Sequence, residues 1–175
     1  MHDIVLLRPD ETMLEEIRSY RLEMLAASSS MDGTGGLEEY DDPSDWLAHI
    51  RALEIPETCP KHLVTATIFA AVRKTDSRLV GMIDLRHRLS DYLAQYGGHI
   101  GYSVRPGERR KGYASKMLAL VLEEARQRGM NRLLITCDED NEASRRAILR
   151  NGGLFDGNVW LEEEKQTVSR YWITL

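Results

Sequence analysis

The stretch "HIGYSVRPGERRKGYASKMLALVLEEA", residues 99–125, joins a short apolar strand to a long amphipathic helix through a basic turn. The strand is expected over residues 99–104 and ends before Pro106 and Gly107, because proline and glycine interrupt strand pairing. The helix is expected to begin near Gly112 and to end at Gly129, with its apolar residues on one stripe. This order places the unpaired N–H groups of a helix N-terminus directly after a strand, which is typical of an anion site.

The turn itself carries positive charge where the helix dipole is also positive. Arg109, Arg110 and Lys111 follow one another, and Gly112 and Ala114 leave room for a close anion. These features favour phosphate binding, although a basic turn that merely faces solvent has the same composition. The signatures G-x-x-x-x-G-K-S/T for nucleoside triphosphates and G-x-G-x-x-G for dinucleotides are missing from the sequence.

The remaining sequence alternates between strand and helix patterns that predict an α/β fold. Strands are expected at residues 4–7, 63–72, 79–85, 99–104, 133–137, 158–161 and 168–173. Helices are expected after Asp10 and at residues 42–53, 112–129 and 141–151. The order β-α-α-β-β-β-α-β-α-β-β predicts a mixed, largely antiparallel twisted sheet with helices on both faces. In this sheet we expect 63–72 and 79–85 to form a hairpin and the apolar run 133–137 to lie centrally.

Composition limits the class of protein. The chain has 175 residues and a hydrophobic content of 42%, which suits one domain over residues 1–175. Its formal net charge of −5 disfavours a general affinity for nucleic acid or for anionic membrane, and no segment has the ~18 apolar residues of a membrane span. Cys59 and Cys137 lack the spacing of a disulfide framework, and the histidines and cysteines lack that of a zinc site. We therefore expect a cytoplasmic protein without a metal.

Two stretches together resemble the GNAT superfamily of N-acyltransferases. In residues 99–125, Arg109, Gly112 and Ala114 occupy the three fixed positions of its motif A signature, Q/R-x-x-G-x-G/A. The stretch "ITCDEDNEASRRAILRNGGLF", residues 135–155, resembles motif B, and the predicted order of elements agrees with the GNAT fold. The resemblance implies an enzyme that transfers an acetyl group from acetyl-CoA to a primary amine.

The resemblance also implies which residues hold acetyl-CoA. The turn and the start of the helix would bind the coenzyme A pyrophosphate through Arg109, Arg110, Lys111, Gly112, Tyr113, Ala114 and Ser115. Main-chain groups of Tyr102, Ser103 and Val104 would pair with the pantetheine arm as a further strand would. Asn141 and Ser144 match motif B positions that contact the same arm in relatives.

His99 is the candidate general base. It lies on the strand expected beside the thioester, where many GNAT relatives carry a glutamate, and an imidazole titrates near neutral pH. A strand histidine with a structural role has the same pattern. The general acid is harder to place, because the motif B position of the usual tyrosine is Ile148. Tyr102, Tyr171 and Cys137 are possible substitutes, and stabilisation of the oxyanion by backbone donors alone is a further alternative.

The acceptor is expected to be a small-molecule or peptide amine that the sequence does not identify. Asp84 and His87 could face it, or could lie on a solvated face of their strand. An acidic stretch could attract a cationic amine. Its members are Glu38, Glu39, Asp41, Asp42 and Asp45. Because Ile148 replaces the usual tyrosine, an acyl-CoA sensor without catalysis is an alternative function. A nucleic-acid binder is disfavoured by the net charge. We expect a monomer or a homodimer.

Overall fold

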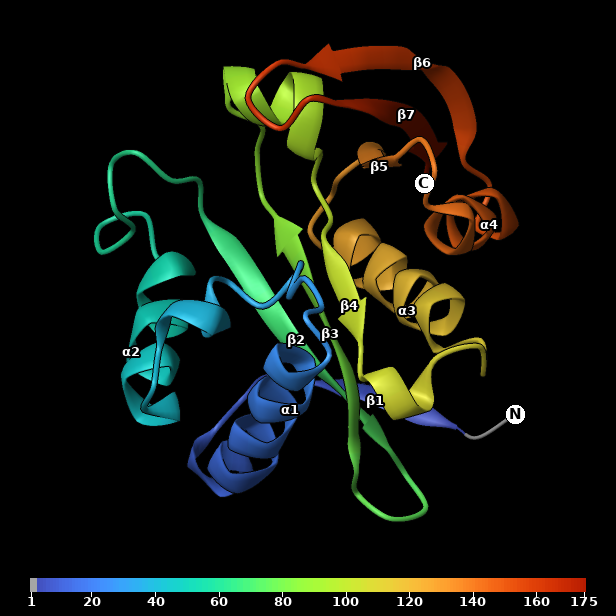
Figure 1. The fold of residues 1–175 in the computed structure, drawn as a ribbon. Coiled ribbons are helices and arrows are strands. Elements are labelled where there is room, and N and C mark those ends of the chain that lie inside the picture. Colours follow the sequence, from blue (N-terminus) through green and yellow to red (C-terminus); the bar gives the residue numbers. More distant parts are fainter. Residues whose placement is uncertain (1–2) are drawn as a thin grey trace.

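The first half of the chain builds a four-stranded antiparallel sheet. The computed structural model describes residues 3–175, so the first two residues of the predicted domain lie outside it. The strands β1 (Ile4–Leu7), β2 (Ala66–Arg73), β3 (Leu79–Arg86) and β4 (Tyr102–Val104) lie in the order β1-β2-β3-β4 (Figure 1). The β2–β3 hairpin that the sequence predicts is confirmed, and its pairing runs from Ala66↔Arg86 to Val72↔Leu79.

The last three strands form a second antiparallel sheet. They are β5 (Arg132–Asp138), β6 (Leu154–Leu161) and β7 (Gln166–Thr174), in the order β5-β7-β6. A single parallel bridge, Ile100↔Ile135, links this sheet to the strand region before β4. The predicted α/β class with largely antiparallel strands is confirmed, but the strands form two sheets rather than one. The apolar run in β5 is buried as expected, and it lies at the edge of the second sheet that faces the first.

A side chain takes part in the contact between the two sheets. The backbone N–H of His99 donates to the Leu134 carbonyl over 2.7 Å, as in a continuous sheet. The return bond is different, because the Leu134 N–H donates to the imidazole Nδ1 of His99 over 2.9 Å instead of to a main-chain carbonyl. The parallel bridge Ile100↔Ile135 follows directly, and β4 is then the last strand of the first sheet.

Helices cover both faces of the first sheet. Helices α1 (Leu14–Ala26) and α2 (Pro43–Leu53) pack on one face, whereas α3 (Tyr113–Gln127) packs on the other and contacts α4 (Glu142–Arg150) (Figure 1). The expected caps form: Asp42 accepts a hydrogen bond from the Ser44 N–H at the start of α2, and Asp10 caps the 3₁₀ turn Glu11–Met13 before α1. Apolar side chains fill both interfaces, so the sheet has a core on each face.

Several strand boundaries and one helical turn differ from the prediction. The strand expected over 99–104 is reduced to Tyr102–Val104, and β6 begins at Leu154 instead of residue 158. A helical turn, Leu93–Gly97, was missed. Its cap signal is present in the sequence, since the Ser90 hydroxyl accepts a hydrogen bond from the Leu93 N–H and Gly98, with φ 65°, ends the turn. No helix in residues 3–175 is long and apolar enough to cross a membrane.

Candidate active site

The turn between β4 and α3 has the backbone shape of an anion site. Arg110 and Gly112 both adopt left-handed backbone conformations, with φ 63° and 84°. Two such residues close together curl the main chain, so that successive N–H groups point to one side. Gly112 is the N-cap of α3, whose first N–H groups have no partner within the helix. The electrostatic argument from the sequence therefore has a geometric basis.

A buried carboxylate holds this turn in place. Glu108 is 6% exposed and accepts from Arg73 over 2.9 Å and from Lys111 over 2.8 Å. The Arg78 guanidinium lies 3.3 Å from its other oxygen. Burial acts to raise the pKa of Glu108, but the hydrogen bonds and charges of Lys111 and Arg73 together outweigh it and keep this pKa low. Lys111 is thereby committed to the Glu108 cluster.

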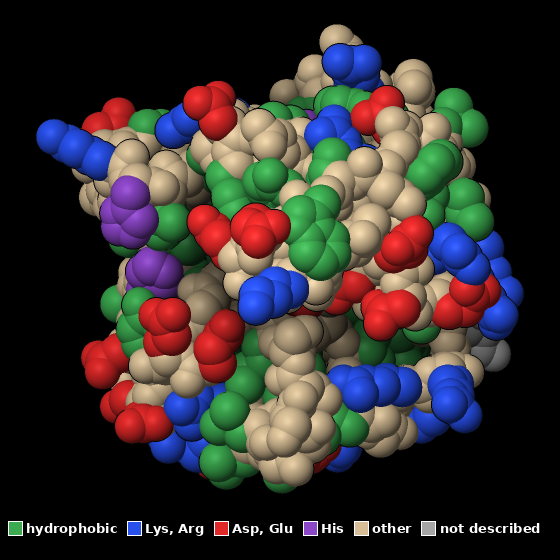
Figure 2. Space-filling model, turned by 45° about the horizontal axis from the view of Figure 1, so that its top comes forward, with side chains coloured by type: hydrophobic (Ala, Val, Ile, Leu, Met, Phe, Trp, Pro, Cys, Tyr) green, Lys and Arg blue, Asp and Glu red, His purple; other side chains and the backbone are tan. Residues whose placement is uncertain are grey.

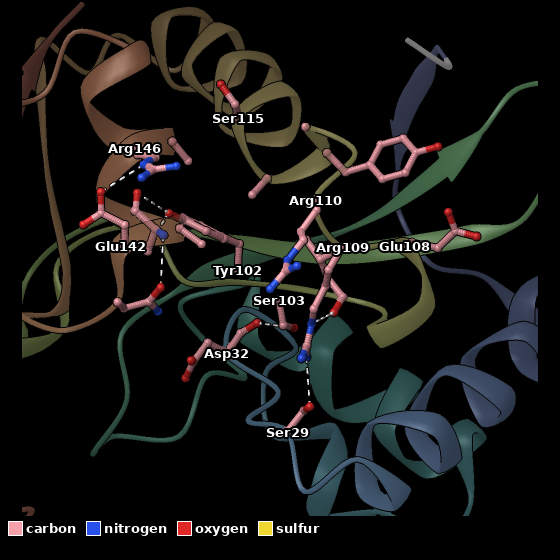
Figure 3. Close-up of a pocket in the computed structure, with 18 of the residues that line it drawn as sticks. Ser29, Asp32, Tyr102, Ser103, Glu108, Arg109, Arg110, Ser115, Glu142 and Arg146 are labelled. Carbon is pink, nitrogen blue, oxygen red and sulfur yellow. Dashed lines mark hydrogen bonds and ion pairs between the residues drawn. The ribbon is translucent and has the colours of Figure 1, made fainter.

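The first cavity, of about 1100 Å³, opens along β4, the turn, the start of α3 and the outer face of α4 (Figure 3). It gathers most of the residues that the resemblance implies: Tyr102, Ser103, Val104, Arg109, Arg110, Gly112, Tyr113, Ala114, Ser115, Asn141 and Ser144. Lys111 is the exception: it does not line the cavity, and its ammonium group pairs with Glu108, which does. The structure thus brings together two sequence regions, motifs A and B, that are separated along the chain.

Two of the predicted residues have structural partners of their own. The Arg109 guanidinium donates to the Val104 carbonyl over 3.1 Å and to the Ser29 hydroxyl over 2.8 Å, so it ties the turn to β4 and to the segment after α1. The Ser103 hydroxyl lies 2.8 Å from the Tyr20 hydroxyl and donates to the Asp32 carbonyl over 2.7 Å. Both side chains position the cavity wall, and in Figure 3 Asp32 and Ser29 lie below β4.

The register of β3 and β4 decides which main-chain groups of β4 are available. The Asp84 N–H donates to the Gly101 carbonyl and the Arg105 N–H donates to the Val80 carbonyl. Because antiparallel ladders alternate, the main chain of Ser103 also faces β3, whereas Tyr102 and Val104 face away from it. The Val104 carbonyl already accepts from Arg109. A ligand lying along β4 would therefore pair with Tyr102 and with the Val104 N–H.

Helix α4 adds basic residues that sequence reasoning missed. Arg146 and Arg150 line the first cavity, and their i,i+4 spacing puts them on one helix face, which is the signal that could have revealed them. Asn151 was also missed. Its side-chain amide donates to the Ser115 carbonyl over 3.1 Å and to the Ala147 carbonyl over 2.8 Å, so it fixes the start of α3 against the end of α4.

A model of the acetyltransferase (GNAT) domain matches residues 11–153, which include motif A and all but the last two residues of motif B. The chain belongs to the GNAT acetyltransferase family. The match confirms the predicted family, the enzyme class and the use of acetyl-CoA as donor. Comparison with curated proteins gave no match.

Solved structures of GNAT acetyltransferases share the fold at low sequence identity. The ribosomal L7/L12 alpha-N-protein acetyltransferase RimL, in complex with coenzyme A, is 17% identical with a TM-score of 0.71 over 98% of this chain and 94% of that one. The Microcin C7 self immunity acetyltransferase MccE, in complex with acetyl-CoA and AMP, is 20% identical with a TM-score of 0.69 over 99% and 93%. The ribosomal-protein-S5-alanine acetyltransferase from Vibrio fischeri is 15% identical with a TM-score of 0.67 over 98% and 91%.

At the inner end of the first cavity of this GNAT domain, a tyrosine and a serine form a hydrogen-bonded pair. The Tyr102 hydroxyl lies 2.5 Å from the Ser144 hydroxyl, and both residues line the cavity. Asn141 caps α4 by accepting from the Ser144 N–H over 3.0 Å, which holds that serine in place. Burial raises the pKa of Tyr102 to about 12, so its hydroxyl keeps its proton at neutral pH.

The usual position of the general acid and the other two candidate acids lie outside the lining of the first cavity. Ile148, at the usual tyrosine position, is fully buried in the core against α3. Tyr171 is 3% exposed, and its ring packs against Phe155 with centroids 5.6 Å apart. Burial raises the pKa of the Cys137 thiol to about 11. Of the three substitutes considered from sequence, Tyr102 alone is part of the first cavity.

The structure assigns His99 a different environment from the one expected of a base. Its side chain is 8% exposed, lies outside the linings of both cavities described here, and packs edge-on against Trp172 at 6.5 Å between centroids. Its Nδ1 accepts the Leu134 N–H, and burial lowers its pKa to about 4. This geometry is that of a neutral imidazole that bridges two strands. It does not support a role for His99 in proton transfer.

A second cavity, of about 630 Å³, lies between α2, the β2–β3 sheet face, and residues 90–93. Asp84 lines it and is 5% exposed, so Asp84 faces a cavity rather than a solvated surface. His87 instead lies near the sheet end, with its Nε2 2.9 Å from the Thr67 hydroxyl. Of the acidic stretch, Glu39 lines the cavity, whereas Asp41 pairs with Arg21 at 3.0 Å and Asp42 caps α2.

In residues 3–175, no group of three or more His, Cys, Asp or Glu is arranged to hold a metal.

Proposed function

We propose that the first cavity binds acetyl-CoA and that the protein transfers its acetyl group to a primary amine carried by a small molecule or a peptide. The observation that carries the proposal is the continuous path from the N-terminus of α3 along β4 to the Tyr102–Ser144 pair. One end of this path suits a pyrophosphate, and its middle offers an unpaired strand edge to an amide-containing arm. The order of these features matches the order of groups along coenzyme A.

The charges along the path support this orientation. Gly112, Tyr113, Ala114 and Ser115 present main-chain N–H groups at the start of α3. Arg110 from the turn and Arg150 from α4 line the same end of the cavity, so phosphate oxygens there would meet cations on two sides. Arg146 is partly neutralised, because its Nε donates to Glu142 over 2.9 Å. We therefore assign the phosphates to the turn and to Arg110 and Arg150.

Tyr102 and Ser144 supply hydrogen-bond donors at the other end. A thiolate leaving group is stabilised by donors that are already in position, and the pair offers two hydroxyl protons of which one is free to point outward. Tyr102, with a pKa of about 12, acts better as a donor that stabilises negative charge than as an acid that loses its proton. This pair takes the place that Ile148 leaves open.

Calorimetry and a transfer assay test the proposal together. We expect the protein to bind acetyl-CoA with a micromolar dissociation constant, about −8 kcal/mol, and to release free thiol when an amine acceptor is added. Failure to bind acetyl-CoA at millimolar concentration would refute the proposed function. The cytoplasmic location and the monomeric or homodimeric state remain predictions, and light scattering of the purified protein measures the latter.

A further inference from the structure

We propose that the second cavity binds the acceptor, an amine on an apolar or aromatic body, and that Asp84 holds its ammonium group and takes its proton. This inference rests on the proposed function, and it adds the acceptor site, the acceptor class and the proton acceptor. The observations that carry it are the burial of Asp84, its hydrogen-bond partners, its bond to the residue before Tyr102, and the chemistry of the cavity walls.

The carboxylate of Asp84 is held rigidly with part of its capacity unused. One oxygen accepts the Gly101 N–H over 2.6 Å, and the other lies 3.2 Å from the Arg86 Nε. Arg86 is fixed in turn, because it donates to the Gly97 and Gly98 carbonyls over 2.8 and 3.0 Å. An ionised carboxylate has about four acceptor positions, so these two partners leave room for an ammonium group.

Asp84 also lies next to the chain segment that leads into the first cavity. Gly101 immediately precedes Tyr102, which lines the first cavity, and its N–H is held by Asp84, which lines the second. The segment after α1 crosses β4 at this point, and a Cβ on Gly33 would lie 2.3 Å from the Gly101 carbonyl oxygen. Asp32 lines the first cavity, and Gly35 lines the second. Main chains at Gly33 and Gly101 pack directly against each other here, and an acetyl group placed beside the main chain of Gly101 and Tyr102 would lie close to Asp84.

The walls of the second cavity indicate the kind of acceptor. They carry apolar side chains, including Leu53, Val64, Ile68 and Leu93, and the aromatic rings of Tyr40 and Tyr92. Tyr40 stacks on His49 at 5.4 Å between centroids. Figure 2 shows histidine side chains and acidic side chains together on the left of the molecule, the side on which α2 lies in Figure 1. A charged amine with an apolar or aromatic body matches these walls better than a polyamine with charge along its length.

The proton balance follows from this placement. The ammonium group gives one proton to Asp84, and the free amine attacks the thioester carbonyl carbon. The C–N bond forms, the C–S bond breaks, and the second nitrogen proton passes to the departing sulfur by way of solvent or the Tyr102–Ser144 pair. Asp84 then releases its proton to solvent, so that ammonium and thioester become amide, thiol and one proton.

Burial supports the role of proton acceptor, since it raises the pKa of Asp84 despite the opposing effect of Arg86. The titratable and charged groups around it come from every wall. They are Arg86 on the same strand, Asp32 and Glu39 from the segment between α1 and α2, Tyr40, His49 of α2, His62, and Tyr92. Arg86 is the cation that pairs directly with it, and Asp32 is the acidic group that adds to the rise.

The test compares Asp84→Asn with the exposed control Asp91→Asn, using tyramine as an aromatic amine probe and spermidine as a polyamine probe. Asparagine can still accept the Gly101 N–H, so we expect unchanged CoA affinity. For tyramine we expect kcat/KM to fall at least 100-fold in Asp84→Asn and to stay within twofold in Asp91→Asn. The parent should lose activity at acid pH with the titration of one group, and Asp84→Asn should lack that dependence.

Several results would overturn the inference. If Asp84→Asn keeps kcat/KM within threefold of the parent, Asp84 is not the proton acceptor. If the parent acetylates only spermidine, or neither probe, the proposed class of acceptor is wrong. If the parent protein does not bind CoA, the proposed function itself is refuted. If Asp84→Asn does not fold, Leu93→Trp serves as a second variant, because the larger side chain would fill the second cavity. A rise of at least tenfold in the KM for tyramine with unchanged CoA affinity supports the acceptor site. An unchanged KM contradicts it.

Discussion

Replacement of Gly112 by alanine separates the backbone shape of the turn from the general stability of α3. Gly112 has φ 84°, a left-handed conformation that costs an L-residue about 1–2 kcal/mol. The bound turn needs this conformation, because it directs the first N–H groups of α3 into the cavity. If the free turn of Gly112→Ala relaxes, binding must restore the strained shape. A cost of about 1–2 kcal/mol then lowers the affinity for coenzyme A about 5- to 30-fold.

Gly129 offers a matched control at the other end of the same helix. It follows the C-cap of α3 with φ 75°, and a Cβ there would meet no atom within 4 Å. Gly129→Ala therefore carries the same conformational cost without touching the cavity. We expect it to lower the free energy of unfolding by about 1–2 kcal/mol and to leave the affinity unchanged.

Titration calorimetry with coenzyme A, together with urea unfolding of the free proteins, measures both effects. The expected pattern is weaker binding by Gly112→Ala alone. Equal affinities of Gly112→Ala and the parent, found alongside a clear loss of stability in Gly129→Ala, would show that the turn does not bind the pyrophosphate.

Three further changes test other contacts. Tyr102→Phe removes the hydroxyl next to Ser144, and we expect kcat to fall by about 100-fold while the Kd for coenzyme A stays within twofold; an unchanged kcat would exclude the pair from catalysis. Asn151→Leu should cost about 1–3 kcal/mol of stability and weaken CoA binding through Ser115, as measured by unfolding and calorimetry. His99→Asn should retain acetyl transfer. Because His99 takes up a proton near pH 6.5 when unfolded but near pH 4 when folded, its contribution to stability is complete above pH 6.5 and falls by about 1.4 kcal/mol per unit toward pH 4. The parent should show this fall relative to His99→Asn in unfolding curves, and parallel curves would contradict it.

The helices and the motif A turn could be predicted because their signals are local. The apolar stripe of α3 and the caps at Asp10 and Asp42 involve residues within one or two turns of each other. The contact between His99 and Leu134 could not be predicted, since the Leu134 N–H donates to an imidazole instead of to a main-chain carbonyl. A strand pattern alone does not show which group will accept that hydrogen bond.

In the candidate site, too, the features set by local sequence could be predicted, and those set by distant contacts could not. Motif A and motif B located most of the first cavity, because each is a contiguous stretch whose shape follows from a helix N-terminus. The pairing of the Lys111 ammonium group with buried Glu108 could not be predicted, since Glu108 is also held by Arg73 and Arg78, which are distant in sequence. The position of Asp84 in the second cavity and next to Gly101 depends on the pairing of β3 with residue 101 and on the segment after α1, which are contacts between distant parts of the chain.

A crystal structure of the protein with acetyl-CoA is the most direct test of the central claim. We predict pyrophosphate oxygens within about 3 Å of main-chain N–H groups at residues 112–115, the pantetheine arm along Tyr102 and Val104, and the acetyl group beside Gly101. Acetyl-CoA bound outside the first cavity, or inside it with the N-terminus of α3 free of phosphate, would contradict the account.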